Sequence, residues 1–301
     1  MKRKSIVASL PFLVFCLLAS NSAYAVAKVI HSERSLYRNI LVTEERSQRC
    51  LQFSVKRDQR SQSCVNLNYP RQMVFSYTKM MMASLLLQPN PKRILVIGLG
   101  GGTLPMALTQ LLPDSKITAV EIDAAVVKVA EEFFQFKQNK NLSVVVQDAR
   151  VFGKRAILKN LKYDLILLDA YNGDYIPEHL LSKEYLEECK TLLSSHGVLA
   201  ANTFSISQLY HYESATYDAV FDHLLNFKSR KSSNRILIAS MQELPSLEVL
   251  QKTAKSLKAR LKPFDIPIHK YPRQLNSKPD WKTDTPPLTD QYSPANLLNS
   301  G

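Results

Sequence analysis

The middle of the chain alternates short, almost wholly apolar runs with longer segments in which apolar residues recur at helical spacing. Runs this apolar are typical of strands buried on both faces, as in a parallel sheet covered by helices. Right-handed crossovers between such strands make the sheet doubly wound, so we expect an α/β fold. The expected strands are 93–97, 117–122, 142–146, 163–168 and 197–201, and the expected helices are 73–87, a segment ending at 112, 124–134, 182–193 and 247–261.

The segment before this region alternates polar and apolar residues, a pattern typical of half-buried strands. We expect three strands, around 38–43, 49–55 and 63–69, with the polar stretch 56–62 as a hairpin loop. Pro70 closes this lobe. The chain is therefore expected to divide into a leader at 1–25, an N-terminal β-hairpin lobe at 26–70 and an α/β domain at 71–301.

The leader has the features of a secretory signal peptide. Basic residues at positions 2–4 precede an apolar run over 6–19, and residues 23–25 form an A-x-A cleavage signal. The apolar run is short for a membrane span. We therefore expect the mature chain to start near Val26, to keep no membrane span after cleavage and to be periplasmic or secreted.

Export changes the expected state of the cysteines. Cys50 and Cys64 lie on facing predicted strands, and an oxidising compartment favours a disulfide between such a pair. Two buried free thiols are the alternative. Cys189 lies on a predicted helix and is expected to be a buried thiol.

Charge is unevenly distributed along the 301 residues. Lys and Arg number 39 against 26 Asp and Glu, and the formal charge of +13 falls to +10 without residues 1–25. The range 227–282 holds 13 of the basic residues and only four acidic ones. Lys252, Lys255 and Lys258 lie between the apolar positions of a predicted helix, which indicates a solvated face more simply than a membrane or polyanion contact.

Polar groups follow four predicted strands at their carboxyl ends, where α/β proteins bind ligands. A glycine loop at 98–102 follows the first strand and allows close approach of the backbone to a ligand. Glu121 can accept both hydrogen bonds of a ribose diol, and Asp148 can accept from an adenine amino group. A helix cap is the alternative for each carboxylate, and it is the role expected of Asp123. The set predicts a nucleoside site made of Gly98, Gly100, Gly101, Gly102, Glu121, Asp148, Ala149 and Asp169.

Three runs, at 94–102, 119–123 and 147–150, resemble the class I S-adenosylmethionine-binding fold. More narrowly, the chain resembles the spermidine synthase (polyamine aminopropyltransferase) family over about residues 37–298. The segments at 75–77, 163–171 and 176–181 are similar to that family, and the tail at 288–294 resembles an exported bacterial spermidine-synthase-like subgroup.

The resemblance implies decarboxylated S-adenosylmethionine, or S-adenosylmethionine, as co-substrate, a small amine as second substrate, and no metal. Glu121 would hold the ribose, Asp148 with Ala149 the adenine, and the loop 98–102 the methionine-derived arm. Asp169 would take a proton from the attacking amine, since a protonated amine has no lone pair. The residues implied to contact the amine are Tyr77, Tyr171 and Asp174.

The chain also departs from the family pattern. The glycine loop lacks the family's Asp, Thr78 and Lys79 replace Gln or His and Glu, and Asn172 replaces a second Asp. Acceptor polyamines are polycations and need several carboxylates, so we expect weak or no activity on putrescine. The acceptor stays open.

Four functions are compatible with these residues. They are an aminopropyltransferase-like enzyme with an altered acceptor, a methyltransferase, a protein that binds a nucleoside or polyamine without turnover, and a nicotinamide dehydrogenase. Asp169 with its downstream loop favours the sulfonium family over the dehydrogenase. The residues at 169–172 differ from the D/N-P-P-Y loop of amino-group nucleic-acid methyltransferases, so no nucleic-acid partner is expected. The six histidines lack metal-site spacing, and the sequence leaves a homodimer open.

Overall fold

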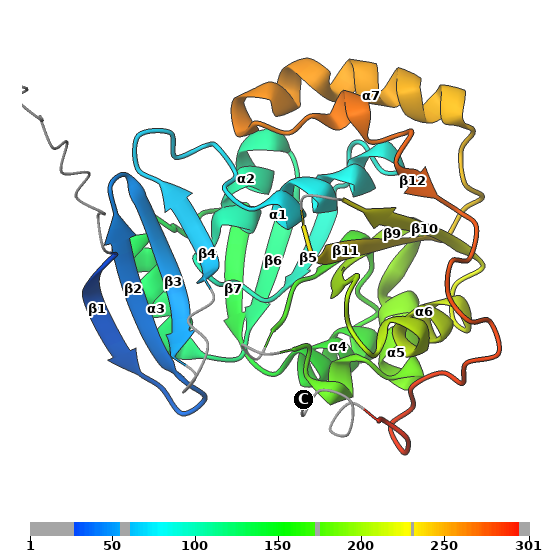
Figure 1. The fold of residues 1–301 in the computed structure, drawn as a ribbon, viewed down its shortest axis with the longest axis horizontal. Helices are drawn as coiled ribbons and strands as arrows, with labels where there is room; N and C mark the ends of the chain where they lie inside the picture. Colours follow the sequence, from blue (N-terminus) through cyan, green and yellow to red (C-terminus); the bar gives the residue numbers. More distant parts are fainter. Residues whose placement is uncertain (1–26, 55–60, 172–174, 230–231, 295–301) are drawn as a thin grey trace, which may run out of the picture.

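The computed structural model describes residues 27–54, 61–171, 175–229 and 232–294. These residues form two sheets, a small antiparallel N-terminal sheet and a large, mostly parallel sheet covered by helices (Figure 1). The α/β fold class is therefore confirmed. The predicted signal peptide lies outside the described residues and stays a prediction.

The large sheet has eight strands in the order β12-β10-β11-β9-β8-β5-β6-β7. The five strands β5 to β9 form a parallel sheet. Strands β10 to β12 extend this sheet beyond β9 in antiparallel pairings. The chain leaves β5 toward β6 and later returns to its other side as β8, so the strand order reverses between β5 and β8. The strands are β5 (Arg93–Ile97), β6 (Lys116–Glu121), β7 (Leu142–Val146), β8 (Tyr163–Leu168), β9 (Leu193–Phe204), β10 (His223–Lys228), β11 (Asn234–Ser240) and β12 (Leu275–Asn276).

Helices bury apolar side chains on both faces of this sheet. On one face, α1, α2, α3 and α7 share a core with β5, β6, β8 and β11. On the other face, α4, α5 and α6 share a second core with the same sheet. The helices are α1 (Ser76–Met81), α2 (Thr103–Leu111), α3 (Ala124–Phe133), α4 (Ala149–Leu158), α5 (Lys183–Leu192), α6 (Tyr210–Asp218) and α7 (Leu247–Leu261), with 3₁₀ turns η1 (Met82–Leu86), η2 (Glu178–Leu180), η3 (Lys262–Phe264) and η4 (Ile268–Lys270).

The N-terminal lobe is a four-stranded antiparallel sheet rather than the three strands expected. The additional strand, β1, comes first in the chain, and its exposed and half-buried positions give little apolar signal. The expected loop at 56–62 falls largely outside the described residues. Apolar residues of this sheet pack on α3, which joins the lobe to the large sheet. The strands are β1 (Lys28–Arg34), β2 (Asn39–Glu45), β3 (Gln48–Ser54) and β4 (Ser61–Asn66).

The helix predicted at 73–87 is divided into α1 and the 3₁₀ turn η1. Met80, Met81 and Met82 are buried in it, so these methionines pack in the core. Cys189 is a buried free thiol on α5, also as expected.

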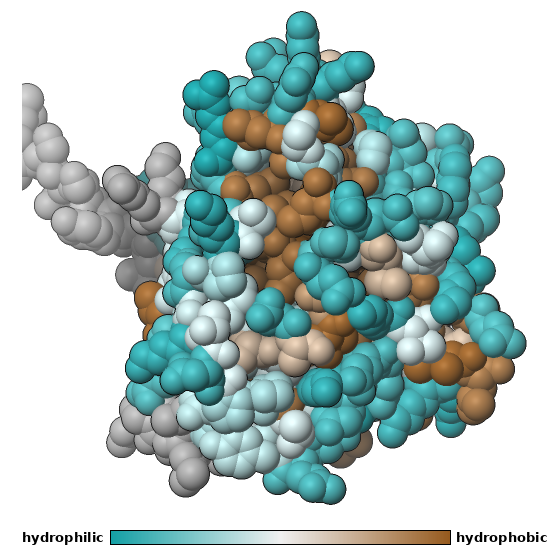
Figure 2. Space-filling model, turned by 90° about the vertical axis from the view of Figure 1, so that its right-hand side faces the viewer, coloured by the Kyte–Doolittle hydropathy of each residue, from teal (hydrophilic) through white to brown (hydrophobic). Residues whose placement is uncertain are grey.

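The helix α7 has the two faces that its spacing predicts. Leu250, Ala254 and Leu257 are buried, and the three lysines between them are exposed. Teal residues cover the top of Figure 2, where α7 lies, above a brown apolar strip in the middle of that face. Every helix in the described part of the chain is too short or too polar to span a membrane.

Candidate active site

A cavity of about 230 Å³ lies at the carboxyl ends of β5, β6 and β8. This is the point where the strand order reverses, and ligands of doubly wound sheets bind there. Most of the residues singled out in the sequence meet in this one cavity. Those that line it are Tyr77, Gly98, Gly100, Glu121, Asp148, Ala149, Asp169 and Tyr171. The predicted substrate residue Asp174 lies outside the described residues.

The glycine loop between β5 and α2 contains three glycines with positive φ. Gly98 and Gly100 line the cavity, whereas Gly101 and Gly102 pack behind it. A Cβ on Gly102 would lie 2.3 Å from the Phe136 ring, and one on Gly101 would lie 2.9 Å from Ser63 Oγ. The loop is therefore compressed between the N-terminal sheet and the segment after α3, and two of its predicted binding glycines serve packing.

Glu121 ends β6 with its carboxylate held by backbone amides. Leu99 N donates to Oε2 at 3.0 Å, and Asp123 N donates to Oε1 at 3.1 Å. Burial raises the pKa of Glu121, against these two hydrogen bonds, which lower it. Each carboxylate oxygen accepts one of these bonds and has capacity for another, so the two oxygens can accept from a diol. Asp123 caps α3 through Ala125 N, as predicted.

Asp148 combines a helix cap with a position on the cavity wall. Its Oδ1 accepts hydrogen bonds from Arg150 N and Val151 N at the start of α4. Its Oδ2 lies 2.9 Å from Nε2 of His179, which also lines the cavity. Burial acts to raise the pKa of Asp148, but the bonds from Val151 and His179 bring it below the ordinary value.

Asp169 follows β8 and faces the same cavity. Its Oδ1 accepts from Asn202 Nδ2 at 2.9 Å, and its Oδ2 lies 3.4 Å from the hydroxyl of Tyr77. Burial raises the pKa of Asp169 to about 7, against these two hydrogen bonds, which lower it. A carboxylate with this pKa can hold or release a proton near neutral pH.

Two tyrosines, Tyr77 and Tyr171, lie close to Asp169. Tyr77 on α1 reaches both Asp169 and the backbone oxygen of Gln62, and the Tyr171 hydroxyl donates to the backbone oxygen of Asn202. Lys79, two residues after Tyr77, does not line the cavity but forms an ion pair with Asp265. Lys79 stands where the family pattern has Glu, yet it brings no positive charge to the cavity wall.

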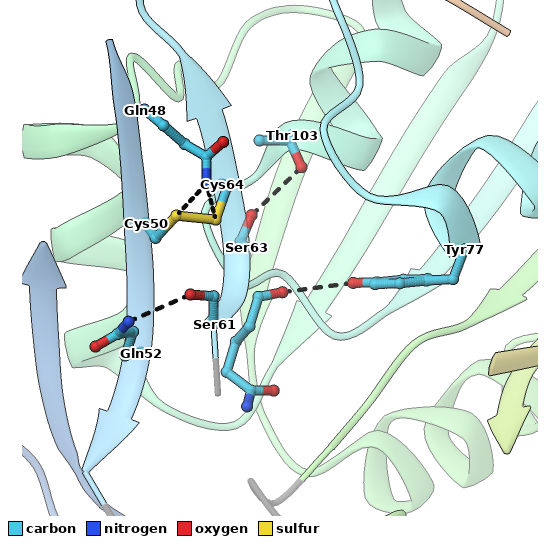
Figure 3. The surroundings of a disulfide bond; sticks show 9 residues. Gln48, Cys50, Gln52, Ser61, Ser63, Cys64, Tyr77 and Thr103 are labelled. Atoms are coloured by element: carbon cyan, nitrogen blue, oxygen red, sulfur yellow. Dashed lines mark hydrogen bonds between the residues drawn. A yellow bond between two sulfur atoms is a disulfide. The ribbon is translucent and has the colours of Figure 1, made fainter. Parts of the chain in front are cut away.

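The N-terminal sheet forms one wall of the cavity. Tyr37, Arg38, Phe53, Gln62 and Ser63 contribute to that wall. Cys50 and Cys64 lie directly opposite each other on β3 and β4 and form the predicted disulfide. Figure 3 shows Ser63, next to Cys64, pointing toward Thr103 at the start of α2, with 3.4 Å between the two hydroxyl oxygens. The disulfide therefore fixes the strand that supplies this wall.

Sequence reasoning missed several residues at the cavity. His179 is one of the six histidines, whose spacing alone indicates no site, yet it contacts Asp148. Asn202, which lies behind the cavity, belongs to the apolar strand β9, where Asn202 and Thr203 are buried polar residues after an apolar run, and that interruption was the available signal. Ser63 carried no signal beyond its place beside Cys64.

The chain matches known proteins over most of its length. A family model described as the spermine/spermidine synthase domain matches residues 74–224. A polyamine aminopropyltransferase of Vibrio vulnificus (strain CMCP6) is 47% identical over 289 residues, which cover 95% of this chain and 97% of that protein. The chain belongs to the spermine/spermidine synthase family. The predicted resemblance is thereby confirmed, whereas membership of an exported subgroup stays a prediction.

Solved structures agree with this family's fold. A probable spermidine synthase from Corynebacterium glutamicum ATCC 13032 superposes with a TM-score of 0.64 at 19% identity, covering 86% of this chain and 99% of that one. At that identity the likeness shows the fold alone. Human methyltransferase-like protein 13, in complex with SAH, superposes with a TM-score of 0.57 at 26% identity, covering 74% and 100%.

The residues present in this family member fit an adenosyl group. Glu121 offers two oxygens to a diol, and the cavity-facing glycines leave room for a ligand against the backbone. Asp148 Oδ2 is the acceptor available to an adenine amino group, and His179 contacts it. Among the described residues, no three His, Cys, Asp or Glu side chains are grouped so as to hold a metal ion.

Proposed function

We propose that the protein transfers an aminopropyl group from decarboxylated S-adenosylmethionine to a small amine. The observation that carries this proposal is the position of Asp169. Its carboxylate faces the cavity whose opposite side holds Glu121, and Tyr77 and Asn202 keep it in place. A proton acceptor beside an adenosyl site is what amine alkylation requires.

Residues at the carboxyl ends of β6 and β7 would bind the donor. Glu121 would accept hydrogen bonds from the ribose hydroxyls, and Asp148 would accept from the adenine amino group. The sulfonium donor supplies a carbon that is activated toward attack. The backbone of Gly98 and Gly100 would lie along its aminopropyl arm.

Asp169 would begin the reaction by taking a proton from the protonated amine, which frees the lone pair of its nitrogen. The amine nitrogen then forms a bond to the carbon next to the sulfonium, the carbon–sulfur bond breaks, and sulfur keeps the electron pair. Methylthioadenosine leaves, and the positive charge that the sulfonium carried passes to the nitrogen of the product. The pKa of about 7 suits a base that must be ionised to act and must release its proton to solvent afterwards.

A methyl transfer from S-adenosylmethionine is the second candidate, and Gly101 favours it. The family pattern has a carboxylate in this loop, but here a Cβ at Gly101 would lie 2.9 Å from both Ser63 and Phe134. The loop thus has neither a carboxylate nor space for one. A neutral loop would tolerate the carboxylate of intact S-adenosylmethionine, and the human neighbour binds SAH.

We further propose that the protein is exported and acts outside the cytoplasm. The leader at 1–25 motivates this proposal, and a disulfide at Cys50 and Cys64 agrees with an oxidising compartment. Amino-terminal sequencing of the native protein would locate the cleavage. A start near Val26 supports export, and an intact Met1 in the cytoplasmic fraction contradicts it.

Asp169→Asn tests the proposed reaction. Asparagine keeps the shape and can still accept from Asn202, but it cannot take a proton. Affinity for decarboxylated S-adenosylmethionine should stay within about twofold, while turnover with the amine falls by about 10² to 10⁴. Isothermal titration calorimetry and product analysis measure the two effects. Unchanged turnover in the variant would contradict the role of Asp169.

A further inference from the structure

Behind Asp169, outside the cavity, three polar side chains form a directed chain of hydrogen bonds. Asn202 on β9 is only 2% exposed and does not line the cavity. Its Nδ2 donates to Asp169, and its Oδ1 accepts from Nδ2 of Asn234 at 3.0 Å. Asn234 Oδ1 in turn accepts from the Ser232 hydroxyl at 2.9 Å.

The orientation of each amide follows from this chain. Ser232 Oγ accepts from the backbone N of Asn234 at 3.1 Å, so its single proton is available for Asn234 Oδ1. The Asn234 NH₂ group must then face Asn202 Oδ1, and the Asn202 NH₂ group must face Asp169. Every bond therefore points toward the carboxylate.

The sheet provides the spacing for this arrangement. In the antiparallel register of β9 and β11, Asn202 pairs with Ile236 and Asn234 pairs with Phe204. Asn202 and Asn234 are diagonal neighbours, and side chains at such positions share one face of a sheet. The register thus places the Asn234 amide of β11 behind Asp169, which follows β8.

We propose that Asn234 is a positioning residue for the transfer reaction, acting through Asn202 to hold one oxygen of Asp169 and leave the other for the amine proton. This role rests on the proposed function. Without the donation from Asn234, only the charge of Asp169 favours the NH₂ end of the Asn202 amide, and that preference is lost whenever Asp169 is protonated. An Asn202 oxygen turned toward Asp169 would repel the ionised form.

Other titratable groups do not replace this contact. Tyr77 and Tyr171 lie beside Asp169, and burial together with the Asp169 charge raises the pKa of each well above the ordinary value. Both stay neutral where Asp169 titrates. Tyr77 lies 3.4 Å from Oδ2, which makes the 2.9 Å bond from Asn202 the shorter of the two.

Asn234→Asp tests the proposal at nearly constant shape. A carboxylate at 234 cannot donate to Asn202, so the Asn202 NH₂ group turns toward it and the Asn202 oxygen turns toward Asp169. We expect the acidic limb of kcat/KM to move up by about one pH unit, because the lost donor and the new negative charge both disfavour the charged carboxylate, and to move up by less in Asn234→Leu, which loses the donor without adding a charge. No shift in Asn234→Leu would overturn the positioning role. The affinity for methylthioadenosine should stay within about twofold.

Ser205→Ala is the matched control. Ser205 follows β9 and also binds the segment before β11, because its hydroxyl donates a hydrogen bond to Ser233 O. Its side chain takes no part in the hydrogen bonds that lead from Ser232 to Asp169. Its pH profile should match that of the wild type. An equal shift in both variants would show a general loosening of the strand pair and overturn the positioning role.

A titration that needs no turnover separates this proposal from the proposed function. The ¹³C carboxyl signal of Asp169, identified by its loss in Asp169→Asn, gives the titration midpoint directly. A higher titration midpoint in Asn234→Asp than in both the wild type and Ser205→Ala supports the positioning role of Asn234, even if no amine is alkylated. Identical midpoints in all three proteins would overturn it. Absence of product with the wild type would count against the proposed function alone.

Discussion

Gly98 and Asp169 pass so close that a Cβ on Gly98 would lie 2.4 Å from the carbonyl oxygen of Asp169. The two residues follow adjacent parallel strands, and Asp169 N also donates to Ile97 O at 2.8 Å. Gly98 has a φ of +96°, which side-chain-bearing residues rarely adopt. The donor-binding loop and the proposed proton acceptor are therefore fixed to each other through the backbone.

Gly98→Ala should destabilise the protein and weaken adenosyl binding. The new methyl group meets backbone, which cannot rotate away, and the positive φ adds strain. A loss of about 1–3 kcal/mol in the free energy of unfolding is expected. Denaturant unfolding measures it.

Gly153→Ala is the control for that substitution. Gly153 lies within α4, and its Cβ would lie 3.8 Å from Leu192, an ordinary contact. Alanine there should raise stability by about 0.5–1 kcal/mol. Equal changes in stability at the two glycines would show that stability does not depend on the close approach of the loop to Asp169.

Glu121→Gln should weaken binding of methylthioadenosine by at least about tenfold, which is the scale of a charge-assisted hydrogen bond. The amide can accept at only one end, so it disturbs the bonds from Leu99 and Asp123 as well as those to a diol. Calorimetry measures the affinity. Glu132→Gln, an exposed change on α3, should bind as the wild type does. An unchanged affinity in Glu121→Gln would remove Glu121 from the site.

Asp148 has two roles that two substitutions separate. Serine is a good helix cap, so Asp148→Ser should keep stability near that of the wild type. Asp148→Ala should lose about 1 kcal/mol, because Arg150 N and Val151 N lose their acceptor. Both variants should bind adenosine compounds more weakly. Wild-type affinity in Asp148→Ser would show that this carboxylate only caps α4.

Ionised Asp169 should cost stability, and the cost depends on pH. Burial places the pKa of Asp169 in the folded state at about 7, above its ordinary value of 3.8, so the folded state binds this proton more tightly than the unfolded state does. Stability is therefore lost as pH rises from about 4 to about 7. Asp169→Asn should be more stable than the wild type at pH 8, by on the order of 4 kcal/mol, and similar to it near pH 4. Thermal unfolding at the two pH values measures the difference in stability between the variant and the wild type. The same difference at pH 4 and at pH 8 would contradict a buried Asp169 with a raised pKa.

The Cys50–Cys64 disulfide closes the N-terminal hairpin across a separation of 14 residues. Replacing both cysteines with serine should lower the free energy of unfolding by about 3 kcal/mol in the chain-entropy model. Adenosyl binding should weaken without being lost, since the N-terminal sheet, which contains Ser63, forms only one wall of the cavity. Thiol titration of the denatured, unreduced mature chain should find Cys189 alone. Three reactive thiols would contradict the disulfide.

The parallel strands could be predicted from the sequence because each is an almost unbroken apolar run. The limits of β7 and β8 match the prediction, since both strands are flanked by polar residues. The edge strand β1 could not be found, because an exposed strand buries too little apolar area to impose a pattern. The antiparallel strands β10 and β11 were also missed, although β11 contains the apolar run 236–239, because they form a hairpin and do not continue the alternation of strand and helix.

The candidate site could be predicted where a residue's place at a strand end determines its direction. Glu121, Asp148 and Asp169 belong to this class. Lys79 and His179 could not be placed, because each side chain is long and its partner comes from a distant segment: Asp265 for Lys79 and Asp148 for His179. Asn234 acts from behind the site, through a register that only the folded sheet defines.

The central claim is aminopropyl transfer, and the nucleoside product tests it most directly. The wild-type protein is incubated with decarboxylated S-adenosylmethionine or with S-adenosylmethionine, and with a panel of amines that includes putrescine. Mass spectrometry then identifies the nucleoside and the modified amine. We predict methylthioadenosine and an equal amount of an amine heavier by one aminopropyl group, formed only from the decarboxylated donor and abolished in Asp169→Asn. S-adenosylhomocysteine with a methylated amine, or no product from any pair, would contradict the account.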